Sequence, residues 1–219
     1  MKRALWKFVG FLLVVAVVSG AVGAWWYFHS GRYRPQTITA HRPEIERALS
    51  QAGWVSPGLT GPQLYLISFR ACPECIAYEA QEFPALQAAG VDTRVILFAP
   101  PDREGIEQST VFERSTVAEL WLSQHRDWPL FQRWMGTRPP SAWTAPGVTP
   151  ADGDAARTGV VTASRAFVAQ ITPWLRANSI PEAYPTIIWR TRDGALHGCA
   201  CTRPEQWANI REELGVAQR

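Results

Sequence analysis

Two cysteines at a predicted strand-to-helix junction constrain this chain more than any other feature. Cys72-Pro73-Glu74-Cys75 follows the apolar run 64–69 and precedes a helical pattern over 76–89. The unpaired N–H groups and positive dipole end of a helix N-terminus favour an anion, and a thiolate is the nucleophile and leaving group of disulfide exchange. Pro73 suits the first helical turn. We therefore predict Cys72 as an exposed attacking thiol and Cys75 as the resolving thiol one turn inward.

A CxxC motif has two other interpretations, a structural disulfide and half of a zinc site. The strand before this motif and the helix after it favour redox chemistry. A second close pair, Cys199 and Cys201, leaves three alternatives open: a static disulfide, a second redox couple that exchanges with Cys72–Cys75, or thiolate ligands that complete a zinc or copper(I) site. We expect no resident metal or cofactor, because an exported location and the motif proline favour disulfide chemistry.

The N-terminus predicts export. Lys2, Arg3 and Lys7 precede an uncharged run over 8–28, which is long enough to cross a bilayer as a helix with its N-terminus in the cytoplasm. A single-pass inner-membrane anchor with a periplasmic catalytic domain is the favoured interpretation, and a cleaved signal peptide that leaves a soluble periplasmic protein is the alternative. The small residues Ala16, Gly20 and Ala24 permit close helix packing, so a homodimer is a further expectation.

The rest of the chain predicts an α/β domain with helices inserted in its middle. Strands are expected over 64–69 and 93–98, with a helix over about 73–89 between them that ends at Gly90 and is kinked or divided at Pro84. Further helices are expected over 43–52, 109–126, 129–135, 164–177, broken at Pro173, and 204–214; residues 137–159 are expected to be an extended connection. The Asp193-Gly194 pair predicts a β-hairpin before Cys199.

This order of elements resembles the thioredoxin superfamily, and in particular the catalytic domain of the bacterial periplasmic DsbC/DsbG disulfide isomerases. The resemblance covers about residues 60–215 and implies a thioredoxin fold with an all-helical insertion. It also implies that Pro185 is the cis-proline beside the active disulfide, and that Tyr184, Pro185 and Thr186 contact substrate. The corresponding domain plan is an anchor or signal peptide over 1–30, a linker with a short helix over 31–60, and a thioredoxin-like domain over 61–219 with the insertion at about 104–180.

Two residues depart from the superfamily pattern. Leu66 occupies the position at which many members bury an acid, and Tyr184 replaces the usual Thr, Val or Ile before the proline. Within the motif, the Glu74 carboxylate disfavours a neighbouring thiolate, and a less stabilised thiolate makes a less oxidising disulfide. We therefore expect a reductase or isomerase.

The expected substrates are exported proteins that contain cysteine, and a membrane thiol reductant is the expected electron donor, because the periplasm has no thiol buffer. The net charge of +3 shows no basic stripe, which argues against nucleic acid. Trp121, Trp128, Trp134 and Trp143 lie in the predicted insertion, where core packing is favoured over a substrate-binding surface. A metallochaperone that uses all four cysteines and a non-catalytic envelope module are the alternative functions.

Overall fold

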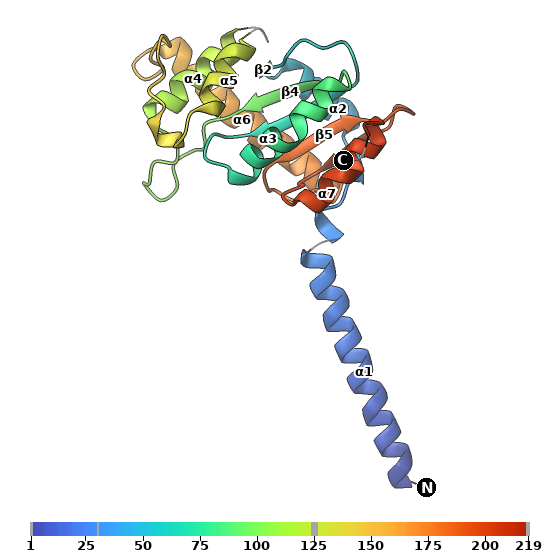
Figure 1. Ribbon diagram of the computed structural model, residues 1–219. Helices are drawn as coiled ribbons and strands as arrows, with labels where there is room; N and C mark the ends of the chain where they lie inside the picture. The colour runs from blue at the N-terminus through green and yellow to red at the C-terminus, as the bar shows by residue number, and fades with distance from the viewer. Residues whose placement is uncertain (1, 30, 124–126, 218–219) are drawn as a thin grey trace.

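A computed structural model describes residues 2–29, 31–123 and 127–217 as a mixed α/β domain with a long N-terminal helix (Figure 1). Its helices are α1 (Lys2–His29), α2 (Arg42–Gln51), α3 (Pro73–Ala88), α4 (Val111–Leu122), α5 (Trp128–Gly136), α6 (Ala155–Ala177) and α7 (Pro204–Leu214). Its strands are β1 (Gln36–Thr37), β2 (Trp54–Val55), β3 (Gln63–Ser68), β4 (Asp92–Leu97), β5 (Thr186–Arg190) and β6 (Leu196–Cys199). Short 3₁₀ turns cover Gly31–Tyr33 and Pro140–Ala142.

The strands form one sheet in the order β1-β6-β5-β3-β4-β2. β3 pairs in parallel with β4 across the crossover helix α3, and every other pairing is antiparallel. The parallel β3–α3–β4 unit and the antiparallel β5–β6 hairpin agree with the thioredoxin fold that the sequence predicted. Both edge strands, β1 and β2, come from the segment expected to be a linker, so residues 36–55 complete the sheet.

Helices cover both faces of the sheet, because side chains along each strand alternate between the two faces. Leu64 and Leu66 of β3 pack in one hydrophobic cluster with α3 and α7, and with α4 and α5 of the insertion. Ile67 packs in the opposite cluster with α2 and α6. β3 is buried on both sides, and its C-terminal end therefore provides a fixed base for the loop that carries Cys72.

Several helix ends follow the sequence signals. Gly90 has φ +83° and follows α3, and the Val91 N–H donates to Leu86 O at 2.9 Å, so the predicted helix stop is confirmed. The expected break at Pro173 is wrong, and Pro84 does not divide its helix, since α3 and α6 continue through these prolines. Both prolines are exposed, and a carbonyl that loses its donor on this side of a helix turns to water. α6 begins at Ala155, well before the expected start at 164, because Asp154 accepts the Arg157 N–H as its N-cap.

The tryptophans of the insertion pack in the core, as expected. Trp134 and Trp143 are buried, and Trp121 and Trp128 are partly buried against the same cluster. Two of the indole N–H groups donate hydrogen bonds: Trp121 to Leu97 O at 2.7 Å, and Trp143 to Thr116 Oγ1 at 2.8 Å. These side chains hold the insertion against the sheet and leave little indole surface for a substrate.

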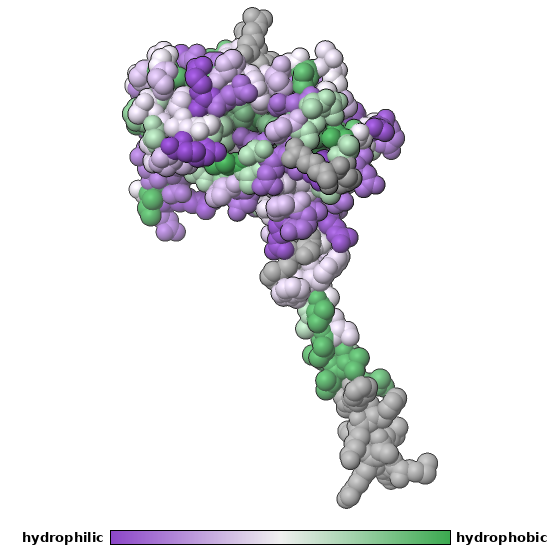
Figure 2. Space-filling model, in the orientation of Figure 1, coloured by the Kyte–Doolittle hydropathy of each residue, from purple (hydrophilic) through white to green (hydrophobic). Residues whose placement is uncertain are grey.

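The N-terminal helix α1 extends away from the domain (Figure 1). Its apolar side chains, which include Leu13, Val17 and Trp25, are exposed. Figure 2 shows a green, hydrophobic band on this helix. Within the described ranges, however, no helix combines the length and the apolar character needed to cross a membrane. The expectation of a transmembrane anchor is therefore not supported by the structure.

Candidate redox site

Cys72 caps the N-terminus of α3. β3 ends at Ser68, a three-residue loop follows, and Cys72 is extended (φ −84°, ψ 106°) before Pro73 opens the helix. The Cys72 Sγ accepts the Cys75 N–H at 3.1 Å, which satisfies one of the unpaired donors of the first turn. The two cysteines form a disulfide with their Cα atoms 5.3 Å apart. The sequence motif thus folds into a disulfide whose first sulfur lies at the positive end of a helix.

The expectation that Cys72 is exposed is wrong for this disulfide state. Cys72 is 2% exposed and Cys75 is fully buried, whereas Ala71, Pro73 and Glu74 are exposed around them. The reason is the cap itself: the Cys72 side chain turns inward to bond with Cys75 Sγ and to accept the N–H of Cys75. An attacking thiolate reaches the sulfur only past the rim formed by Ala71, Pro73 and Glu74.

Two ionisable side chains that lie close to this disulfide in the chain are buried. Arg70, two residues before Cys72, is 2% exposed and donates from Nη2 to Thr137 O at 2.6 Å. Glu79, one helical turn after Cys75, is 9% exposed, and its Oε1 accepts no hydrogen bond from the described residues. Burial raises the pKa of Glu79 to about 8, although Arg70 and Arg138 favour its charged form. A largely protonated Glu79 and a buried Arg70 guanidinium thus lie within four residues of the motif in the chain near neutral pH.

The predicted substrate-contact residues lie at the same end of the sheet as the motif. Thr186 is the register partner of Ile67, near the point where β3 leads into the Cys72 loop. The Tyr184–Pro185 peptide bond is cis, as the resemblance implied, and Pro185 is buried. Tyr184 packs edge-on against Phe69 of the Cys72 loop, with 5.5 Å between ring centroids. The structure thus brings Tyr184 to the loop that carries the disulfide, and Thr186 Oγ1 is satisfied by Ala183 O at 2.7 Å.

The second pair, Cys199 and Cys201, forms its own disulfide at the end of β6. Cys199 is the register partner of Ile187 on β5, so this disulfide lies at the same end of the sheet as Cys72, with β5 between β6 and β3. Both cysteines are buried, and the Trp207 Nε1–H donates to Cys201 O at 2.9 Å. Their surroundings are the apolar cluster of α3 and α7.

The four sulfurs do not gather into one metal site. They are joined in two separate disulfides, and across residues 2–29, 31–123 and 127–217 no group of three or more His, Cys, Asp or Glu side chains could hold a metal ion. The arrangement therefore gives no support to a chaperone that binds copper through all four cysteines.

Comparison with known proteins gives a fold but no named family. No family model and no curated protein matches the chain. Among solved structures, a linker-deletion mutant of Proteus mirabilis ScsC, which also carries a point substitution, is similar with a TM-score of 0.51 and 14% identity, over 98% of this chain and 96% of that one. The catalytic domain of the same protein (TM-score 0.46, 15% identity, 82% of this chain and 99% of that one) and its compact conformation (0.47, 14%, 96% of each) are also similar. The first likeness shows the fold and, with the sheet order and the Cys72–Cys75 disulfide, supports the thioredoxin superfamily; it does not extend to a DsbC/DsbG type in particular.

Neither Arg70 nor Glu79 was predicted from the sequence as a buried site residue. A weak signal was present, because Glu79 lies four residues after Cys75 and therefore on the same side of the helix. Glutamate at such a position is usually exposed, and only packing against the insertion buries it. Arg70 carried no comparable signal, since its burial depends on Thr137, which is 67 residues away in the chain.

Proposed function

We propose that this protein is a thiol–disulfide oxidoreductase that acts on cysteine-containing proteins outside the cytoplasm. The observation that carries the proposal is the Cys72–Cys75 disulfide at the start of α3, directly after the central strand β3. A helix N-terminus stabilises the thiolate that disulfide exchange requires, and burial on both faces of β3 fixes its position.

The reaction uses two thiols in sequence. In the reduced protein, the Cys72 thiolate attacks a substrate disulfide, forms a mixed disulfide and releases one substrate thiolate. The Cys75 thiol then loses its proton, its sulfur attacks Cys72, and the second substrate thiolate leaves. The substrate disulfide gains two electrons and the Cys72–Cys75 pair loses them.

Glu79 is the group that we propose accepts the proton of Cys75. Leu66 occupies the position of the acid that assists this step in many superfamily members, and Glu79 lies one turn along the helix from Cys75. Helical side chains lean toward the helix N-terminus, which directs this carboxyl back toward Cys75. A carboxyl with a pKa of about 8 is partly ionised near neutral pH, and its ionised form can accept the proton of a thiol near its ordinary pKa of 8.5.

The direction we propose is reduction or isomerisation. Glu74 is exposed beside the disulfide, where its negative charge disfavours the Cys72 thiolate. A membrane thiol reductant that returns electrons to the Cys72–Cys75 pair completes the cycle. The proposed export of the domain rests on the positive charges and the apolar run at the N-terminus. The proposal does not include a membrane-spanning anchor.

The test uses the full chain, reduced and mixed with insulin in the presence of dithiothreitol. The expected result is faster precipitation of insulin chains with wild type than with Cys72→Ser. Cys75→Ser should accumulate a mixed disulfide through Cys72, which mass spectrometry after acid quenching detects. Equal rates for wild type, Cys72→Ser and buffer would overturn the proposed activity.

A further inference from the structure

A groove of about 780 Å³ runs beside the redox loop. We call it the α6 groove, because one wall is formed by the exposed side of α6. Phe69 and Ala71 of the Cys72 loop line the groove, and so does Tyr184, which packs against Phe69. A polypeptide in this groove therefore passes directly in front of the disulfide rim.

The floor of the α6 groove is aromatic. Phe69, Phe98 and Tyr184 form a three-ring cluster with centroids 5.1 to 5.5 Å apart. Phe69 and Tyr184 are partly exposed and Phe98 is buried beneath them. Burial raises the pKa of Tyr184 to about 12, so its phenol is neutral at physiological pH. The floor thus presents uncharged ring surface, on which aromatic and other apolar side chains pack well.

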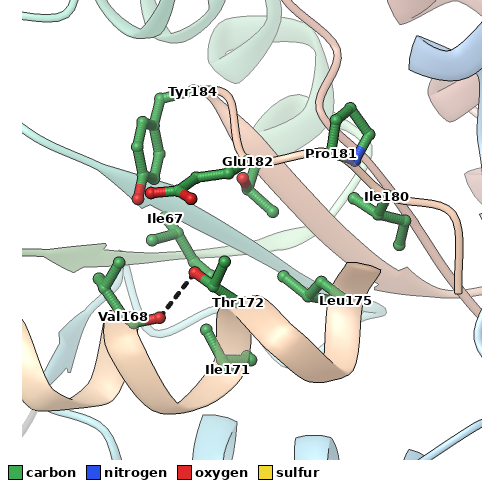
Figure 3. Close-up of a pocket in the computed structure, with 10 residues that line it drawn as sticks. Ile67, Val168, Ile171, Thr172, Leu175, Ile180, Pro181, Glu182 and Tyr184 are labelled. Carbon is green, nitrogen blue, oxygen red and sulfur yellow. Dashed lines mark hydrogen bonds between the residues drawn. The ribbon is translucent and has the colours of Figure 1, made fainter. Parts of the chain in front are cut away.

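The wall formed by α6 is held in place. Figure 3 shows Tyr184 and Glu182 over Val168 and Thr172, with Thr172 Oγ1 donating to Val168 O at 2.7 Å. At the C-terminal end of α6, the Asn178 side chain accepts the Thr39 and Ala40 N–H groups at 2.9 Å and donates to Ala40 O at 2.8 Å. The C-terminal end of the α6 wall is therefore anchored to residues 39–40, and a wall that is held before binding lowers the entropic cost of binding.

The charge along the α6 groove is mostly positive. Its charged lining residues are Arg103, Arg165, Arg176 and Glu182, and Glu182 pairs with Arg176 at 2.5 Å. Within the described part of the chain, neither Arg103 nor Arg165 has an acidic partner within 4.0 Å.

Arg165 instead donates through Nε to Ala99 O at 2.8 Å, and through Nη2 to Pro100 O at 3.4 Å and to Ser109 Oγ at 3.5 Å. The charge of Arg165 also helps to lower the pKa of Asp152, but the Asp152 carboxylate is already paired with Arg114 at 2.5 Å. Within the described residues, the Arg103 guanidinium and the Nη1 group of Arg165 are thus left for an acidic ligand.

We propose that the α6 groove selects substrate segments that carry an aromatic side chain and an acidic side chain near the reacting cysteine. The aromatic side chain packs on Phe69 and Tyr184, and the carboxylate binds Arg103 and Arg165. This inference rests on the proposed oxidoreductase activity and narrows its substrate class.

The test measures how fast the single thiol of the Cys75→Ser full chain reacts with short peptides. Each peptide carries one cysteine as a mixed disulfide with thiopyridine. The Cys72 thiolate attacks the peptide sulfur, the peptide–thiopyridine bond breaks, and thiopyridone leaves with the electron pair and is detected by absorbance. A neutral leaving group is used because an anionic one would itself bind the arginines.

The peptides differ only beside the cysteine: Asp with Phe, Asn with Phe, Lys with Phe, and Asp with Ala. We expect the Asp–Phe peptide to react roughly tenfold faster than the Asn–Phe peptide, the Lys–Phe peptide to be slowest, and the differences to shrink with added salt. Replacement of Phe by Ala should cost a similar factor.

Three variants assign the effect to the groove. Arg103→Gln removes an exposed charge and should bring the Asp-to-Asn rate ratio close to one. Glu182→Gln should raise the same ratio, because it removes the acid of the groove. Arg133→Gln, which removes an exposed arginine of α5 outside the groove, is the matched control and should keep the wild-type ratio.

Equal rates for all four peptides, or a ratio that Arg103→Gln and Glu182→Gln leave unchanged, would overturn the groove proposal while the oxidoreductase proposal stands. Failure of Cys72 to react with any of the peptides, when its thiol is free after denaturation, would overturn the oxidoreductase proposal itself.

Discussion

The two disulfides of this protein lie at the same end of one sheet but in different surroundings. Cys72–Cys75 begins a helix, has two exposed neighbours within its own motif and lies between the buried ionisable residues Arg70 and Glu79 in the chain. Cys199–Cys201 ends a strand inside the apolar cluster of α3 and α7.

Both pairs are buried, so burial does not distinguish them. The helix terminus and the nearby charges make only Cys72–Cys75 suited to exchange with substrates. We therefore infer that Cys199–Cys201 is a static disulfide that fixes the turn between β6 and α7.

The largest expected contrast is in activity. Cys72→Ser should reduce insulin reduction to the uncatalysed rate, because Cys75, the other thiol of the first helical turn, is fully buried. The double change Cys199→Ala/Cys201→Ala should keep catalysis and lower the free energy of unfolding by roughly 1–2 kcal/mol, the value for a disulfide that closes a very short loop. Urea unfolding of the oxidised proteins measures the second effect. Loss of turnover in the folded double variant would instead support a redox relay between the two pairs.

The second contrast is in accessibility. Dithiothreitol with iodoacetamide should label Cys72 in the native protein well before Cys199 or Cys201, because only the first pair has an exposed rim. Labelling of the second pair should wait for local unfolding. Mass spectrometry of peptides at timed intervals measures both rates. Simultaneous labelling of the two pairs in native conditions would remove the distinction.

A third prediction concerns the buried carboxyl beside the first disulfide. The folded-state pKa of Glu79, about 8, is above its ordinary value of 4.5, so the folded protein holds a proton that the unfolded chain releases. Stability must therefore fall as pH rises from about 4.5 to 8, by an amount on the order of a few kcal/mol from this group. The difference in unfolding free energy between Glu79→Gln and wild type should grow in favour of the variant over this window.

Urea unfolding at several pH values measures that difference. Glu212→Gln, which removes an exposed carboxylate of α7, is the matched control and should show no such growth. The same Glu79→Gln protein should resolve mixed disulfides more slowly near pH 8, where wild-type Glu79 is partly ionised and can accept a proton from Cys75. A pH-independent stability difference, with resolution as fast as in wild type, would refute both roles of Glu79.

The smallest expected effect is that of Glu74. Glu74→Gln removes an exposed negative charge beside Cys72, so the equilibrium with glutathione should shift toward a more oxidising disulfide by roughly two- to fivefold, the effect of one exposed charge. Quantifying reduced Cys72 by alkylation across glutathione buffers measures the shift. A shift in the reducing direction would contradict the electrostatic argument for a reductase or isomerase.

The elements that the sequence predicted well are those encoded by local signals. The CPEC motif after an apolar strand, Gly90 at the end of α3 and Asp193-Gly194 in the hairpin each require only a few neighbouring residues. The two short edge strands lacked such a signal, since a two-residue strand has no measurable periodicity. β1 exists because Gln36 and Thr37 pair with β6, about 160 residues later in the chain.

The sequence by itself determined the redox motif and the β3–α3–β4 unit, because turn residues, a helix cap and apolar runs act over a few positions. Only the tertiary structure decided which side chains surround the disulfide. Arg70 is buried under the Thr137 carbonyl, Glu79 has its pKa raised by packing against the insertion, and Arg165 joins Phe69 in the α6 groove. Desolvation and electrostatic fields depend on every group within several ångströms, and the fold brings those groups together from distant parts of the chain.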